Sequence, residues 1–150
     1  MLAILLATLL SATVTPLGQK EPTGPENPFN GVWTADIAKS KQDPKAQFQS
    51  VTLHITVSRD SVTMSSRVVT AGKEQRFTET FRTDGSETPG SLTPGVVLVA
   101  RWLGPAVLAT TAYKEGRLLG LITYEISADG RMLTSRSSGM SEQVMVFERK

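Results

Sequence analysis

The chain has 150 residues, and its 16 basic and 14 acidic side chains leave a formal net charge of +2. This near balance gives no electrostatic reason to expect nucleic-acid binding. With no cysteine and one histidine, the chain cannot form a disulfide framework, use a thiolate for catalysis, or build a metal site that needs two histidines. The length fits a single domain.

Residues 1–18 carry no charged side chain, and Leu2 to Leu10 is almost wholly aliphatic. This run is short for a membrane-spanning helix, which needs about 20 residues, and fits the apolar part of a secretory signal. We therefore expect residues 1–18 to be a signal peptide with an approximate cleavage site. The alternative is an internal hydrophobic strand or helix. The mature protein is expected to be secreted or periplasmic, with no membrane span once the signal is removed.

Residues 19–28 form a polar linker rich in proline and glycine, and residues 29–150 read as one β-domain. Apolar residues alternate along this domain with the period of strands, clearest at Val51, Leu53, Ile55 and Val57. The pattern predicts nine strands, over residues 31–36, 51–57, 62–68, 77–82, 96–103, 106–113, 118–126, 131–137 and 142–148.

Short turns are predicted between most of these strands. The expected turn dipeptides, which all contain a residue that tolerates positive φ, are Ala71-Gly72, Asp84-Gly85, Glu115-Gly116, Asp129-Gly130 and Ser138-Gly139. The one long loop expected is Ser86 to Gly95. Such strands form either a sandwich or a closed barrel. Consecutive hairpins favour an antiparallel up-and-down barrel of eight or nine strands, because a Greek key needs a long crossover.

The first strand follows an irregular segment and opens with Gly31-Val-Trp33, and the chain ends in Phe147-Glu-Arg149. With Lys39 to Lys41 and Asp129-Gly130, these residues make residues 27–150 resemble the lipocalin and fatty-acid-binding (calycin) barrels. They resemble in particular small secreted bacterial domains of that kind, whose function is unassigned. The resemblance implies structural roles for Gly31, Trp33 and Arg149, with the arginine packed across the indole. The second and third lipocalin motifs and the paired lid helices of the fatty-acid-binding barrels are not found.

Several polar side chains fall in the middle of predicted strands. Arg101 shares the parity of Val97, Val99 and Leu103, which predicts an inward arginine that must be paired or bind an anion. An inward arginine with tyrosine and glutamate could fix a polar ligand head while apolar walls hold the tail. The candidate ligand-binding residues are Arg101, Glu79, Tyr113, Tyr124 and Arg136. The alternative is that Arg101 reaches the barrel mouth or faces water.

The resemblance implies non-catalytic binding of a small apolar or amphipathic ligand, with no cofactor and no metal. Whether the protein is an enzyme stays open, and no catalytic residue is assigned. An enzyme would use Glu79, Glu125 or His54 as an internal acid or base. A protein-interaction or inhibitor module would act through the Ser86–Gly95 loop and would have a core filled by side chains. A purely structural domain is the remaining alternative.

Overall fold

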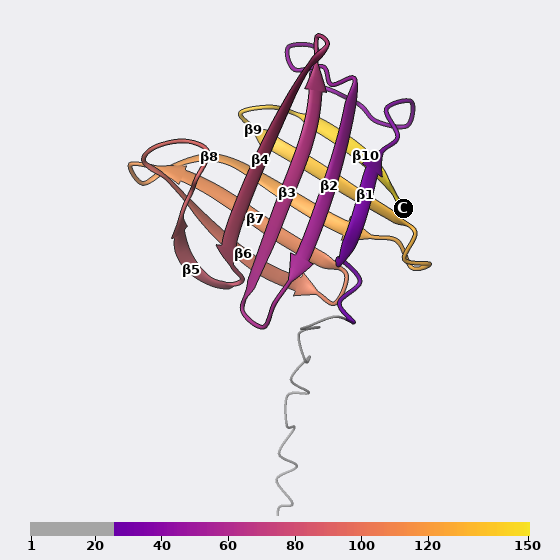
Figure 1. The fold of residues 1–150 in the computed structure, drawn as a ribbon. Helices are drawn as coiled ribbons and strands as arrows, with labels where there is room; N and C mark the ends of the chain where they lie inside the picture. Colours follow the sequence, from indigo (N-terminus) through magenta and orange to yellow (C-terminus); the bar gives the residue numbers. More distant parts are fainter. Residues whose placement is uncertain (1–25) are drawn as a thin grey trace, which may run out of the picture.

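The computed structural model describes residues 26–150, so the expected signal peptide and residues 19–25 of the linker lie outside the described residues. Ten antiparallel strands form one sheet that curls into a nearly closed barrel (Figure 1). The all-β, up-and-down barrel expected from the sequence is therefore confirmed, with ten strands in place of eight or nine. The strands are β1 (Gly31–Ala35), β2 (Ser50–Val57), β3 (Ser61–Thr70), β4 (Lys73–Arg82), β5 (Asp84–Pro89), β6 (Val96–Gly104), β7 (Val107–Lys114), β8 (Arg117–Ile126), β9 (Met132–Gly139) and β10 (Gln143–Arg149).

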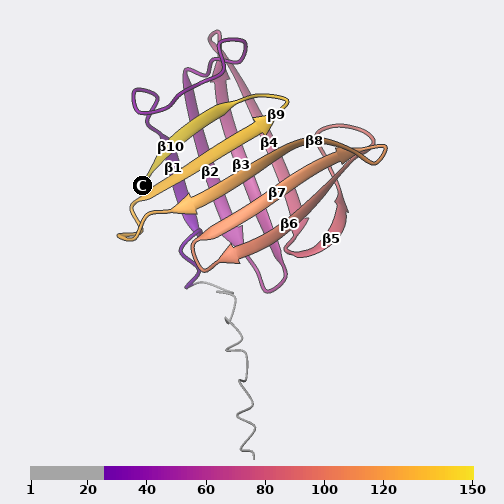
Figure 2. The same cartoon turned by 180° about the vertical axis from the view of Figure 1, so that it is seen from behind.

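The strands follow the order β4-β3-β2-β1-β10-β9-β8-β7-β6-β5. Strands β1 to β4 form one wall, and β6 to β10 form the opposite wall, crossing the first at a steep angle (Figures 1 and 2). Strands β1 and β10 pair in the middle of the sheet, and the two edges are β4 and β5. These edges face each other without a backbone ladder, and we call this joint the seam. Among residues 26–150, no helix has the length and apolar character needed to cross a membrane.

Strand β5 corrects the sequence-based assignment of Asp84-Gly85 as a hairpin turn and of residues 86–95 as one loop. Residues Asp84–Pro89 pair with β6, and the register shifts between Asp84 and Glu87. The segment lacks apolar alternation and ends in proline, which hid it from a pattern search. Such a sequence is tolerated here because an edge strand has a ladder on one side only.

Two of the expected turns are tight two-residue hairpins. Both residues of Ala71-Gly72 and of Glu115-Gly116 have positive φ, between 49° and 73°, as a type I′ turn requires. Ser138-Gly139 is not a turn. Strand β9 continues through Gly139, which pairs with Gly120 of β8. A β-carbon at Gly139 would lie 2.5 Å from the carbonyl oxygen of Leu119, so the small residue permits a close approach of the two backbones.

The alternation in β2 places Val51, Leu53, Ile55 and Val57 inside, and His54 outside. The same parity rule fills the barrel with one continuous apolar core, whose largest fully buried side chains are Trp33, Phe29, Ile55, Leu108, Leu133 and Val62. Phe29 precedes β1 and packs edge-on against Trp102 of β6, with ring centroids 5.1 Å apart. These two aromatic rings connect the segment before β1 with the opposite wall of the barrel.

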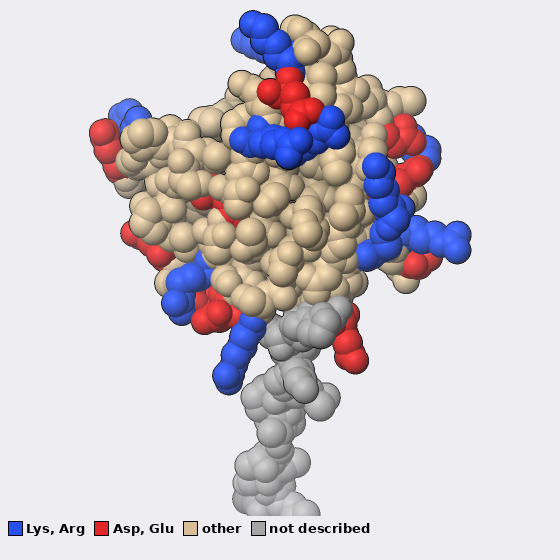
Figure 3. Space-filling model, in the orientation of Figure 1, with Lys and Arg blue, Asp and Glu red and all other residues tan. Residues whose placement is uncertain are grey.

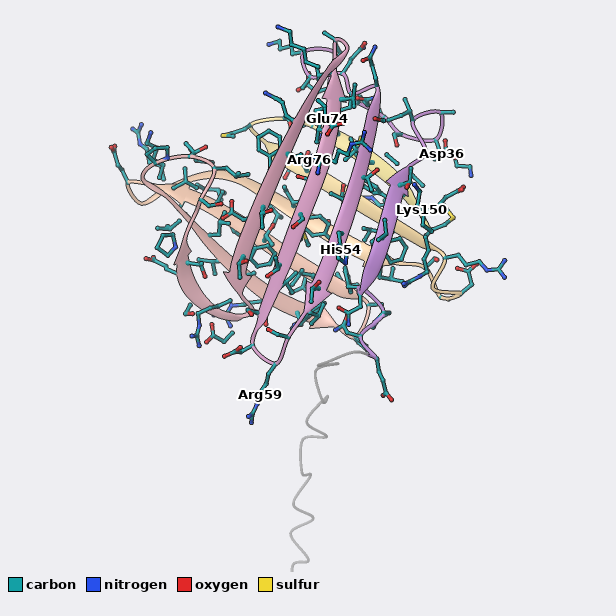
Figure 4. All side chains as sticks on the ribbon, in the orientation of Figure 1. Asp36, His54, Arg59, Glu74, Arg76 and Lys150 are labelled. Atoms are coloured by element: carbon teal, nitrogen blue, oxygen red, sulfur yellow. The ribbon has the colours of Figure 1, made fainter. Side chains whose placement is uncertain are left out.

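Charged side chains lie mainly around the rim of the molecule and in one outer cluster, and the middle of the face in Figure 3 is largely uncharged. The cluster is built on β3 and β4, where Glu74 pairs with Arg67 at 2.6 Å and with Arg76 at 2.9 Å. Glu74 and Arg76 lie toward one end of β4, and His54 lies on β2 (Figure 4). All of these side chains are on the outer surface, and no charged side chain of residues 26–150 is fully buried.

Candidate functional site

A cavity of about 230 Å³ lies between the two walls of the barrel. We call it the main cavity. Its lining residues come from six strands and the loop after β5, and they are Leu53, Met64, Ser66, Phe77, Glu79, Phe81, Leu92, Leu98, Thr110, Ile122 and Tyr124. Most of this surface is apolar because the inward parity of each strand carries aliphatic or aromatic side chains. A cavity that such residues leave unfilled is uncommon in a close-packed protein and suits an apolar guest.

A second cavity of about 140 Å³ lies toward β8 and β9, and we call it the side cavity. It shares Leu98, Thr110 and Ile122 with the main cavity, so the two are neighbours. Its remaining lining residues are Ala112, Leu119, Gly120, Leu121, Ser137, Ser138, Met140 and Ser141.

Glu79 supplies the charge in the main cavity. It lies in β4 between Phe77 and Phe81 on the inward parity, and its side chain is half-buried. Its Oε1 atom accepts a hydrogen bond of 2.8 Å from the backbone N–H of Ser91. Within residues 26–150, its Oε2 atom has no hydrogen-bond or ion-pair partner. One carboxylate oxygen is therefore available to a ligand.

Tyr124 supplies a neutral polar group on the opposite wall. It lies in β8 and lines the main cavity next to Ile122. Burial raises the pKa of Tyr124 to about 12, while a hydrogen bond with Thr110 acts in the opposite direction. The phenol therefore stays protonated at neutral pH and can donate or accept a hydrogen bond.

The main cavity meets the surface along the seam. Leu92 is 55% exposed and Phe77 is 36% exposed, and both line the cavity. Hydrogen bonds that involve side chains connect the two edges here. The backbone N–H of Arg82 donates to Thr88 Oγ1 at 3.0 Å, and Ser91 Oγ donates to the backbone carbonyl of Thr78 at 2.9 Å. The exposed apolar residues and the lack of a ladder make this joint the natural route into the barrel.

Trp33 of β1 and Arg149 of β10 lie opposite each other where these two strands pair. The guanidinium lies 4.2 Å from the centre of the indole ring, and Trp33 is fully buried. Arg149 also donates to the backbone carbonyls of Gly130, Asn30 and Pro28 at 2.9, 2.7 and 2.5 Å. Gly31 has a φ of 135°, and a β-carbon there would lie 2.8 Å from Arg149 Nη1. The glycine thus leaves room for the arginine.

Of the five candidate ligand-binding residues, the structure brings Glu79 and Tyr124 to the main cavity. The inward orientation predicted for Arg101 is wrong. Arg101 is exposed on the outer face of β6, where its guanidinium lies over Gly85. Tyr113 is also on the outer face, beside Val97 and Val99. Arg136 is exposed there too, 3.6 Å from a carboxylate oxygen of Glu125. These three residues line neither cavity.

The two other residues considered for an enzyme, Glu125 and His54, are both on the outer surface. The parity that made Glu125 a candidate for the interior is therefore corrected. Residues 26–150 contain no group of three or more histidine, aspartate or glutamate side chains that could hold a metal ion. Of the three acid–base candidates, Glu79 is inside the barrel.

The sequence did not single out the apolar lining or the polar residues Ser66, Ser91 and Thr110. Ser66 could have been found, because it interrupts the apolar parity of β3 between Met64 and Val68. Ser91 could not, because it lies in the segment taken for a free loop. Its contact with Glu79 depends on the chain after β5 lying against β4 at the seam, and the local sequence pattern does not show this.

No known family profile matches the sequence, and no curated protein matches it. Solved structures with the same fold include the fluorescent protein UnaG, with a TM-score of 0.60 at 20% identity over 81% of this chain and 97% of that chain. The fatty-acid-binding protein of Schistosoma mansoni, solved in complex with arachidonic acid, gives 0.59 at 16% identity over 85% and 99%. Fatty-acid-binding protein 1 of Echinococcus granulosus gives 0.59 at 14% identity over 81% and 97%. The barrel of this chain thus has the fold of the fatty-acid-binding proteins.

Proposed function

We propose that this protein binds a small, largely apolar molecule inside its barrel without catalysing a reaction. The main cavity carries the proposal, because its walls are apolar and it reaches the surface at Leu92 and Phe77. The likeness to fatty-acid-binding proteins supports the same conclusion at the level of the fold. A module acting only through loops would have no reason to keep an interior cavity.

The volumes limit the size of the ligand. An apolar cavity of about 150 Å³ holds one benzene molecule. The main cavity measures about 230 Å³ and the neighbouring side cavity about 140 Å³. By this scale the main cavity accepts about 9 non-hydrogen atoms and the side cavity about 6. The proposed ligand is therefore an eight- to ten-carbon chain or a small ring system (roughly, from the same scale), rather than a long lipid.

A matched pair of substitutions tests the proposal. Ser66 lines the main cavity, whereas Ser65, the preceding residue, contacts Thr78 on the outer face at 3.1 Å. We expect Ser66→Phe to fill the cavity and abolish binding of 1-octanol, measured by titration calorimetry, while Ser65→Phe leaves binding unchanged. Circular dichroism checks that both variants fold. If the unmodified protein binds neither 1-octanol nor a small apolar dye, the proposal is wrong.

The proposal extends to the place of action, which is outside the cytoplasm. It is supported by the uncharged, aliphatic character of residues 1–18. Expression of the full chain followed by cell fractionation and N-terminal sequencing tests it. A protein recovered from the cytoplasm with Met1 or Leu2 at its N-terminus would refute export and leave the binding proposal standing.

A further inference from the structure

We propose that the ligand's polar end is a primary amine or ammonium group that binds to Glu79, rather than a carboxylate. This inference rests on the proposed function and specifies the chemical class of the ligand. It departs from the sequence-based expectation that Arg101 would receive an anion, because Arg101 lies on the outer face.

The charge inside the barrel has one sign. The residues that line the main and side cavities include one ionisable acid, Glu79, and no lysine, arginine or histidine. Tyr124 stays neutral at physiological pH because its pKa is raised by burial. Ser66, Thr110 and Ser137 add hydroxyl groups without charge. A carboxylate ligand would bring a second negative charge into a space that offers no cation, at a high electrostatic cost.

The geometry of Glu79 favours a donor. The hydrogen bond from the Ser91 N–H fixes Oε1 at 2.8 Å and leaves Oε2 without a protein partner among residues 26–150. An ionised carboxylate only accepts hydrogen bonds, so its natural partner is an N–H or O–H group. An ammonium group gives the strongest such contact, because the hydrogen bond is charge-assisted.

The surroundings of Glu79 suit the rest of an aliphatic amine. Phe77 and Phe81 share the inward parity of β4 with Glu79, and Leu92 lines the same cavity from the loop after β5. An amine placed at Glu79 lies at the seam, where it keeps contact with water, while its chain extends inward past Leu98. A small recessed acidic area beside β4 is visible in Figure 3, surrounded by uncharged surface.

The test compares octylamine, octanoate and 1-octanol, which share one chain length, by titration calorimetry at neutral pH. We expect octylamine to bind at least about tenfold more tightly than octanoate, since one charge-assisted hydrogen bond accounts for that ratio. The formal net charge of +2 would by itself favour the anion, so a preference for the amine reports on the cavity. Octanoate binding as tightly as octylamine would overturn the inference and leave the proposed function intact. Failure of all three compounds would overturn both.

Two variants test whether Glu79 causes the preference for octylamine. Glu79→Gln keeps the shape of the side chain and an oxygen that can accept from Ser91, so the barrel is expected to fold. It should remove the preference for octylamine while 1-octanol still binds. Glu125→Gln removes a charge from the outer face, and it should change neither the affinity for octylamine nor the affinity for 1-octanol. A preference for octylamine that survives in Glu79→Gln would show that the amine binds elsewhere.

Discussion

Replacing Arg149 tests how much its contacts with Trp33 and the neighbouring backbone stabilise the barrel. Its guanidinium stacks on Trp33 and donates to three backbone carbonyls. A cation–π contact stabilises by about 0.5–2 kcal/mol, and each hydrogen bond by about 1 kcal/mol before discounting for exposure. Arg149 is exposed, so we expect Arg149→Met to lower the free energy of unfolding by about 2–3 kcal/mol. At about 4 °C per kcal/mol for a domain of this size, the melting temperature falls by roughly 8–12 °C.

Urea titration followed by the fluorescence of Trp33 and Trp102 measures this loss. Arg149→Lys keeps the positive charge but loses the planar group that reaches three carbonyls. Its free energy of unfolding should therefore lie between those of the unmodified protein and Arg149→Met. Lys150→Met removes a neighbouring charge and should change stability by less than about 0.5 kcal/mol. If Arg149→Lys matched the unmodified protein, the carbonyl contacts would contribute nothing and the reasoning would be refuted.

Three further predictions concern stability and the site. Gly139→Ala should lower the free energy of unfolding, measured by urea titration, by more than about 2 kcal/mol, because the new methyl group collides with the backbone of β8. At Gly116 the new methyl group meets open space, so Gly116→Ala should cost about 1 kcal/mol, from the positive φ alone. Equal losses in the two variants would contradict the close approach of β8 and β9. The pKa of Asp84 is held well below its ordinary value, first by Arg82 and then by Ser86, so this group's stabilisation is present at neutral pH and is lost as the pH falls through the acidic range. Asp84→Asn should therefore lower stability at neutral pH, and this loss should shrink as the pH falls below the ordinary range of an aspartate; a loss that does not change with pH would rule out the charge. Tyr124→Phe should weaken octylamine binding less than Glu79→Gln does, and the reverse order would make the phenol the main polar contact.

The sequence predicted the architecture well where one parity of a strand is apolar and the other polar. Residues Val51–Val57 are such a case: the predicted alternation is present, and its apolar parity faces inward in the structure. Strand β6 was misread because both parities are apolar: Val97, Val99 and Leu103 face out, while Val96, Leu98 and Trp102 face in. The inward set contains no charge, whereas the outward set contains Arg101. The parity without a charge is therefore the better guide to the interior in a strand of this kind.

The site could be predicted only in part. Glu79 was found because it shares its parity with Phe77 and Phe81, and Tyr124 because it lies in the middle of a predicted strand. The contribution of Ser91 and Leu92 could not be found, because β5 shows no strand pattern and the seam joins residues on opposite edges of the sheet. The size of the cavity also lies beyond a sequence pattern, since it depends on how far two curved walls separate.

The seam affects how easily the diameter of the barrel can change. Everywhere else, moving two neighbouring strands apart breaks a row of backbone hydrogen bonds. Between β4 and the segment from Thr88 to Ser91, three contacts made by side chains span the joint. The barrel can therefore widen by separating β4 from β5 at the seam. The nine hydrogen-bonded strand pairings stay intact during such a movement, so the diameter of the interior can change without loss of the sheet.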